Sequence, residues 1–220
     1  MFIVRENKKF NLTKQGGFTL LEALIAFFVL SVGLIGIVSL LTLSKSTQHQ
    51  SLQRTRAIAL ANDLLERIRS NPGGIQIYGS RNKSSPLGGN SIASQPTNSC
   101  TKSAPCSTEE KALLDLWKWE QVLDGNGVTQ PANLGGNIKT SGLIYPSACV
   151  NFEPVAEKNK TGAVSITIEW RGLTKLSDGI KTPDQECKQI SSEETPYRRA
   201  IQVTTYIAGD LVMPTNSGDS

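Results

Sequence analysis

Residues 16–43 form the most apolar stretch of the chain. After a glycine pair and Phe18, the stretch contains a single charged residue, Glu22. About 20 apolar residues are enough for a helix to cross a bilayer, so this pattern predicts a membrane-spanning helix. A carboxylate costs a few kcal/mol in such a position, so Glu22 is predicted to be functional and to need a positive partner.

Residues 44–70 continue the helix with a different pattern. Apolar side chains recur at steps of three and four residues, which predicts an amphipathic helix with one face on a soluble domain. These positions are Leu52, Ala57, Leu60, Ala61, Leu64 and Ile68, with Ile58 and Leu65 beside them. Pro72 and the glycines after it end the pattern. One helix is therefore expected from Phe18 to Ser70, about 80 Å long at a rise of about 1.5 Å per residue.

Gly33 and Gly36 interrupt the apolar half of this helix. Glycine inside a helix costs about 1 kcal/mol relative to alanine. The pair therefore either marks a stretch that loosens or provides small residues for close approach of another helix. The residues alone leave both interpretations open.

The rest of the chain predicts a small head domain. Residues 71–110 are rich in glycine, serine, asparagine and proline, which favours a long surface loop with a short strand at 75–78. Ser107 and Glu110 fit a capping box and predict a helix over 108–123 that stops before Gly125. Trp117 and Trp119 cannot share one face of this helix. Either one of them is in the core and the other at an edge facing the loop or a neighbouring subunit, or both are packing residues.

Three later segments alternate between apolar and polar residues. Residues 141–152 predict an irregular strand broken by Pro146, and residues 164–170 and 201–207 predict regular strands. This pattern is typical of an antiparallel sheet with one buried face, and the amphipathic stripe of residues 52–68 is the available partner for that face. The expected class is α+β, and the tail from residue 211 to residue 220 is expected to be disordered.

The charge of the chain is concentrated at its N-terminus. The formal net charge is +4, and residues 1–15 contribute +3 of it, from four basic residues and Glu6. The basic residues are Arg5, Lys8, Lys9 and Lys14. Positive charge before an apolar helix predicts a cytoplasmic N-terminus, with the rest of the chain on the other side of the membrane. The net charge therefore reflects topology and does not indicate nucleic-acid binding.

Four cysteines lie beyond the apolar helix, at Cys100, Cys106, Cys149 and Cys187. An even number of cysteines in an exported domain predicts two disulfides, and four cysteines allow three pairings. We favour Cys100–Cys106 and Cys149–Cys187. The sequence has no CxxC pair and only one histidine, His49, so a zinc site is not expected. Asp124-Gly125-Asn126-Gly127 begins like a calcium loop but lacks the later acidic ligands, which favours a turn.

The residues Gly16-Gly17-Phe18-Thr19-Leu20-Leu21-Glu22, after a basic leader and before an apolar helix, resemble the signal of the type IV pilin-like family. The resemblance implies that prepilin peptidase cleaves after Gly17 and methylates the new N-terminus at Phe18. It implies that Glu22 pairs with the amino group of Phe18 on a neighbouring subunit. It also implies a pilin fold, with a leader at 1–17, a membrane and filament-core half of the helix at 18–43, an amphipathic half at 44–70 and a head at 71–210.

Three shorter segments narrow this resemblance. Cys106-Ser107-Thr108, the residues Asp115–Trp119 and the strand Ile166–Trp170 resemble the minor pilins called type IV pilus modification proteins, or PilV. That resemblance implies a bacterial inner-membrane protein that joins other minor pilins and pilus subunits to start pilus assembly. It also implies a place at the pilus tip with a large adhesin, and a role in cell adhesion and twitching motility.

Two other functions stay open. A pseudopilin of a type II secretion system has the same leader, and an uncleaved single-pass anchor or receptor has the same helix. An enzyme is not expected, because the sequence lacks a Ser/His/Asp set, a glycine-rich phosphate loop and a carboxylate pair. No cofactor is expected either.

Overall fold

The computed structural model describes residues 17, 19–97, 100–126, 129–131, 137–139, 142–156, 158–175, 187 and 195–209. The chain forms two compact units, which divide between Thr47 and Gln48. Each unit is described by itself below. The predicted tail at 211–220 lies outside the described residues, as do Gly16 and Phe18.

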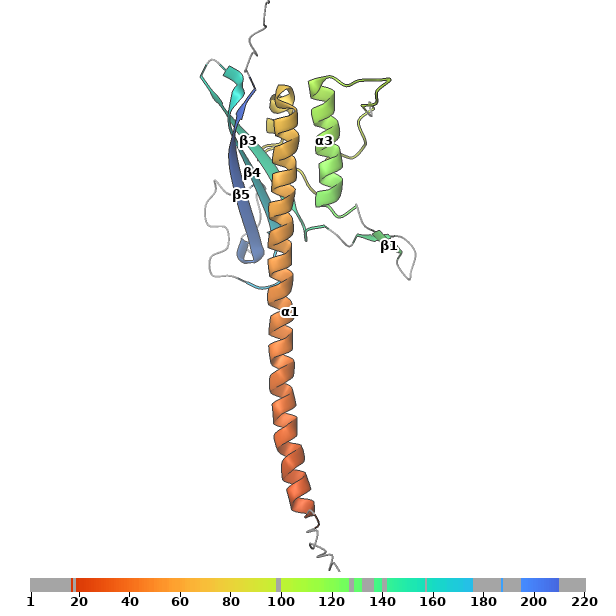
Figure 1. Ribbon diagram of the computed structural model, residues 1–220, viewed down its shortest axis with the longest axis vertical. Helices are drawn as coiled ribbons and strands as arrows, with labels where there is room; N and C mark the ends of the chain where they lie inside the picture. The colour runs from red at the N-terminus through yellow and green to blue at the C-terminus, as the bar shows by residue number, and fades with distance from the viewer. Residues whose placement is uncertain are drawn as a thin grey trace, which may run out of the picture. The chain divides into compact units, whose positions relative to one another are not determined.

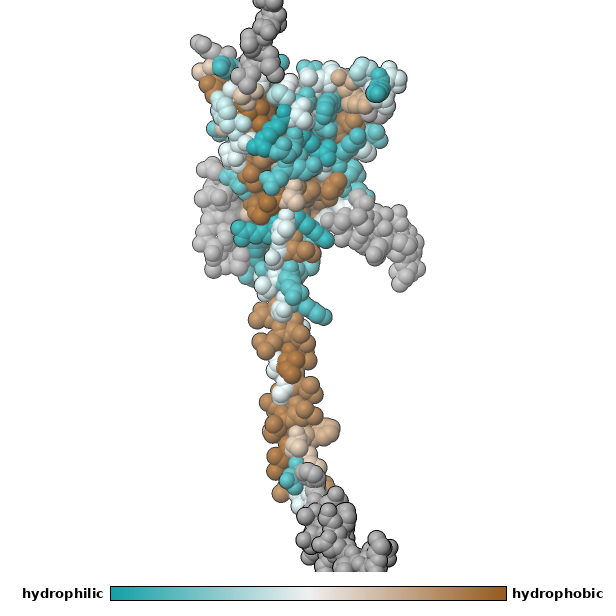
Figure 2. All heavy atoms as spheres, in the orientation of Figure 1, coloured by the Kyte–Doolittle hydropathy of each residue, from teal (hydrophilic) through white to brown (hydrophobic). Residues whose placement is uncertain are grey.

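The first unit consists of the beginning of helix α1, which runs from Leu20 to Ser70. The helix starts two residues after the expected position and ends at the predicted one. Its apolar side chains are exposed on every face, and Figure 2 shows this half of the helix as almost continuously apolar. By length and composition, α1 is the one helix among the described residues that is able to cross a membrane.

The second unit contains the rest of α1, which packs against both a sheet and a second helix. In Figure 1 this part of α1 lies between strands β3–β5 and helix α3. Its buried residues are Gln53, Ala57, Ala61, Leu64, Leu65 and Ile68. This list confirms the amphipathic stripe over most of its length. The prediction was wrong at Leu52 and Ile58, which are 51% and 41% exposed: Leu52 precedes the first buried residue, Gln53, and Ile58 lies beside the buried face that Ala57 and Ala61 share.

The segment after α1 is helical, so the strand predicted at 75–78 was wrong. A 3-10 turn covers Pro72–Gly74 and helix α2 covers Ile75–Gly79. Ile75 and Tyr78, which lie one helical turn apart, are both fully buried. Gly74 permits the close approach of α3, because a Cβ at this position would lie 2.7 Å from the Thr108 carbonyl oxygen.

The predicted loop from 80 onward is irregular but does not lie entirely on the surface. Leu87 is 1% exposed, and its backbone N–H and C=O pair with those of Ala148. The loop therefore contributes to the core, which its composition did not indicate. Helix α3 then runs from Thr108 to Leu123 as predicted, and Ser107 and Glu110 form both hydrogen bonds of the capping box.

Three antiparallel strands form the sheet, in the order β3-β4-β5. They are β3 (Ser147–Val155), β4 (Lys158–Arg171) and β5 (Arg198–Ala208). The first predicted strand therefore begins only after Pro146. A short antiparallel pair, β1 (Thr129–Pro131) and β2 (Asn137–Lys139), was not predicted.

One face of the sheet meets α1 as expected. Val164, Ile166, Ile168 and Trp170 on β4 join Leu64 and Ile68 of α1 in the same core. The expectation of a single buried face was incomplete. Thr167 and Glu169 on the opposite face of β4 are also buried, because Cys187 covers that side and is itself fully buried.

Candidate functional site

The start of α1 is set by a side chain at Thr19. The Thr19 hydroxyl accepts a hydrogen bond from the Glu22 N–H at 3.3 Å, and the Thr19 carbonyl accepts from the N–H groups of Glu22 and Ala23. Thr19 is therefore the N-cap of the helix. Gly17 is exposed, and a Cβ built on it meets no atom within 4 Å. The Gly17–Phe18 peptide bond thus precedes the capped helix.

Glu22 lies in the first turn of α1, where the helix dipole favours negative charge. Its side chain is exposed, and within the described part of the chain it forms no ion pair. The sequence analysis therefore identified a carboxylate whose partner is not supplied by the described residues of this chain.

The other polar side chains in the apolar half are satisfied within the helix. The hydroxyl of Ser31 donates to the Phe27 carbonyl at 2.8 Å, that of Ser39 to the Ile35 carbonyl at 3.0 Å, and that of Thr42 to the Val38 carbonyl at 2.9 Å. Such bonds to the preceding turn remove the cost of placing a hydroxyl in lipid. Within the described residues, the Glu22 carboxylate has no comparable partner.

Gly33 and Gly36 lie inside the uninterrupted α1, and no atom lies within 4 Å of a Cβ built at either position. The helix is therefore continuous through both glycines in the single chain. Their exposed backbone is compatible with close packing of another helix.

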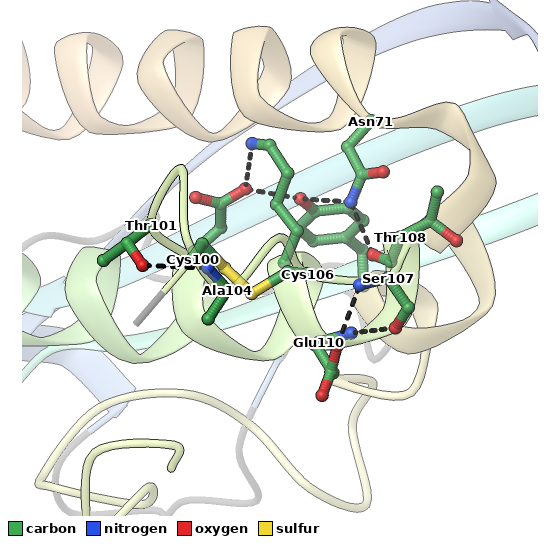
Figure 3. Close-up of a disulfide and its surroundings, with 11 residues drawn as sticks. Asn71, Cys100, Thr101, Ala104, Cys106, Ser107, Thr108 and Glu110 are labelled. Carbon is green, nitrogen blue, oxygen red and sulfur yellow. Dashed lines mark hydrogen bonds and ion pairs between the residues drawn. A yellow bond between two sulfur atoms is a disulfide. The ribbon is translucent and has the colours of Figure 1, made fainter. Parts of the chain in front are cut away.

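The two disulfides have the pairings that the sequence analysis favoured. Cys100 pairs with Cys106, six residues apart, and Cys149 on β3 pairs with Cys187, 38 residues apart. The shorter bridge closes the loop just before the cap of α3 (Figure 3). The longer bridge attaches Cys187 to the sheet face opposite α1.

Beside the shorter disulfide, a buried polar network holds the end of α1 and helix α2 against α3. The Asn71 side-chain amide donates to the Thr108 carbonyl at 2.7 Å (Figure 3), and the Tyr78 hydroxyl donates to the Asp115 carboxylate at 2.9 Å. Burial raises the pKa of Tyr78 above its ordinary value, and the nearby Asp115 carboxylate acts in the same direction. The hydroxyl thus stays protonated and able to donate.

Sequence reasoning missed a second set of residues, in which two carboxylates of α3 hold the loop at 88–92. The fully buried Glu120 side chain accepts backbone N–H bonds from Gly88, Ser91 and Ile92 at 2.7–2.8 Å. Asp124 accepts from Gly89 and Asn90 at 2.9 and 2.7 Å. Gly88, Gly89 and Asn90 all have positive φ, which turns their N–H groups inward. The sequence analysis predicted the helix over 108–123 but gave no role to Glu120 or Asp124.

The remaining predicted positions have structural surroundings. Trp119 is fully buried and its indole N–H donates to the Leu60 carbonyl at 2.9 Å, whereas Trp117 is half-buried. This arrangement confirms that the two rings do not share a face. His49 is half-buried on α1. In the described part of the chain, no group of three or more His, Cys, Asp or Glu side chains is arranged to hold a metal ion.

A long N-terminal helix with an apolar exposed first half, followed by a small antiparallel sheet against its second half, defines an α+β pilin fold. Two family comparisons agree with this class. Residues 12–38 match the prokaryotic N-terminal methylation motif, and residues 42–117 match the family of the type IV pilin Tt1218. Over these two ranges the chain is therefore similar to type IV pilins and to the prepilin methylation motif. No curated protein and no solved structure matches it significantly.

Proposed function

We propose that this chain is a minor pilin of a type IV pilus, similar to the PilV type. Prepilin peptidase removes residues 1–17 and methylates Phe18, and the protein is anchored in the inner membrane by residues 18–43. The head at 71–210 lies in the periplasm, supported by the helix at 44–70. The mature protein then joins other minor pilins to start pilus assembly, takes a place at the pilus tip beside a large adhesin, and serves adhesion and twitching motility.

One observation carries this proposal: among the described residues, Glu22 forms no ion pair, and it lies in a helix half whose apolar side chains are exposed on every face. Such a helix half needs lipid or other helices around it. A carboxylate in the same environment needs a cation. The amino group at Phe18 of a neighbouring subunit supplies that cation, and subunit addition brings the two groups together.

The first test is the N-terminus of the protein made in cells. Mass spectrometry is expected to find a chain that begins with N-methylated Phe18. Gly17→Ala is expected to slow leader removal, whereas the control Gly33→Ala leaves it unchanged. Neither substitution meets an atom within 4 Å, so a processing defect at Gly17 is not a packing defect. A mature chain that still begins at Met1 would overturn the proposal.

The second test removes the charge of Glu22. Glu22→Gln is expected to leave insertion and cleavage intact but to abolish co-purification of the chain with other pilus subunits. Glu66→Gln is the matched control, since Glu66 is an exposed carboxylate of the second unit whose side chain is 66% exposed. Unchanged incorporation of the Glu22 variant would refute charge pairing.

Deletion of the gene separates the pilus from a secretion system with the same processing. Loss of surface pili and of twitching, with normal export of folded proteins, is the expected result. The opposite pattern would assign the chain to the secretion system.

A further inference from the structure

Cationic and aromatic side chains gather at one end of the sheet, where β3 begins and β4 ends. We call Tyr145, Arg171, Lys175 and Tyr197 the Tyr–Arg patch. The Arg171 guanidinium lies 5.9 Å from the ring centroid of Tyr145 and 5.4 Å from that of Tyr197, and the Lys175 ammonium lies 5.7 Å from the Tyr197 centroid. The patch is thus a series of alternating rings and cations.

Two neighbouring arginines show what a structural arginine does here. Arg198 is buried, forms an ion pair with Glu169 at 3.1 Å and donates to the Tyr145 carbonyl at 2.7 Å. Arg199 donates to the carbonyls of Pro196, Arg198 and Thr174. Both are therefore used within the fold.

Arg171 and Lys175 differ from these two residues. Over the described ranges, neither has a carboxylate partner or a side-chain hydrogen bond. Contact with aromatic rings orients a cation without using its N–H donors. The Arg171 side-chain donors are therefore held in place and have no acceptor among the described residues.

Tyr145 has a strained backbone conformation, and packing of its side chain within the fold does not offset that strain. Its φ is +46°, a conformation that residues with a side chain rarely adopt. Tyr145 is 72% exposed, so burial of the residue does not compensate for the strain. Two hydrogen bonds hold this backbone in place. The Arg198 guanidinium donates to the Tyr145 carbonyl, and the Arg171 backbone N–H donates to the Ile144 carbonyl at 2.8 Å. Strain maintained in this way around an exposed group is typical of functional sites.

We propose that the Tyr–Arg patch binds an acidic segment on the head of a neighbouring pilin-type subunit. Tyrosine and arginine are the side chains enriched at the energetic centre of protein interfaces. Two cations without partners in the described chain favour a segment with at least one carboxylate that accepts both donors of a guanidinium. Leu173, which is 52% exposed between the two cations in sequence, adds apolar contact area. This inference rests on the proposed function, because the partner is a subunit of the same assembly.

The direct test places a photo-crosslinking p-benzoylphenylalanine at position 145 of the full chain in cells. A crosslink to an Asp- or Glu-containing segment of another prepilin-type chain is the expected result. A crosslink to residues 176–194 of the same chain, to phospholipid alone, or to no partner would overturn the proposal. The N-terminus of the same sample is sequenced, so that an unprocessed chain, which refutes the proposed function, is distinguished from a processed chain without a crosslink.

Charge reversal tests the cations. Arg171→Glu with Lys175→Glu is expected to reduce co-purification of the partner at least tenfold, and reversal of the crosslinked acidic residues to lysine is expected to restore it. Lys158→Glu, at the other end of β4, is the matched control and is expected to have no effect. Equal losses in the two variants would contradict a specific contact.

Tyr145→Gly separates binding from folding. Glycine adopts a positive φ at no steric cost, and the relieved strain of about 1 kcal/mol offsets the extra backbone entropy that glycine loses on folding, so the variant is expected to melt within about 2 °C of the parent. It is also expected to lose partner binding because the ring is gone. A variant that melts lower and still binds would show that Tyr145 serves the fold.

Discussion

The two halves of α1 contain the same kinds of apolar residue in opposite environments. Leu40 is 69% exposed and Leu64 is fully buried, although both are leucines of one continuous helix. The difference is that the second half finds its sheet and its companion helix in the same chain. The apolar side chains of the first half are exposed in the described structure. One continuous helix thus contains a buried interface in its second half and an exposed apolar surface in its first half.

The largest expected effect comes from truncating one leucine in each half of α1 and comparing the losses of stability. Leu64→Ala is expected to lower the free energy of unfolding of the head by about 2–5 kcal/mol, because it leaves a cavity in a closed core. Leu40→Ala is expected to leave it unchanged. Urea unfolding of the full chain in detergent, followed by tryptophan fluorescence, measures this, because all three tryptophans (117, 119 and 170) lie in the second unit. Equal effects of the two variants would show that the halves are not independent.

The two disulfides are expected to stabilise the second unit by different amounts. Replacing Cys149 and Cys187 with alanine frees a loop of 38 residues, whereas replacing Cys100 and Cys106 frees one of six. Loop-closure entropy predicts losses of about 4 and about 2 kcal/mol, respectively. The same urea titration measures both. A larger loss from the shorter bridge would show that local packing, rather than chain entropy, dominates.

Glu120 tests how the loop at 88–92 is held. Glu120→Gln is expected to cost about 1–3 kcal/mol, because an amide N–H₂ replaces one of the accepting oxygens and faces backbone donors in a buried site. Asp124→Asn is the comparison, since Asp124 holds Gly89 and Asn90 at the exposed edge and its loss is expected to cost less. Hydrogen exchange of the Gly88, Ser91 and Ile92 amides reports the release of the loop. Unchanged protection in the Glu120 variant would contradict this role.

Sequence reasoning succeeded where one local signal determined the structure. Period and caps predicted α3 from residue 108 to residue 123, and the alternation over 164–170 predicted the core-facing side of β4. The prepilin-like motif agrees with the methylation motif matched over residues 12–38, whereas the roles of Gly17, Phe18 and Glu22 stay predictions. The motif is encoded by adjacent residues, so no tertiary information was needed to find it.

Sequence reasoning failed where distant segments decide the structure. The residues Ile75–Tyr78 suit a strand locally, but the approach of α3 to Gly74 and the burial of Ile75 and Tyr78 make the segment a helix. Leu52 was placed in the buried stripe because its spacing is helical, although the sheet covers α1 only from Gln53 onward. The hydrogen bonds from the loop at 88–92 to Glu120 join segments about 30 residues apart, and no spacing rule predicts them.

The smallest expected effect compares the same capping motif in the two units. Ser107-x-x-Glu110 caps α3, and Thr19-x-x-Glu22 has the same pattern at the start of α1. Ser107→Ala is expected to lower the stability of the head by about 1 kcal/mol. Thr19→Ala is expected to leave that stability unchanged, because the first turn of α1 lies in the other unit. It is instead expected to loosen the turn that carries Glu22, so that incorporation into the assembly falls while the urea midpoint stays constant. A urea midpoint that shifts with Thr19→Ala would mean that the start of α1 contributes to the folding of the head. The two halves of α1 would then not be independent in their effect on stability.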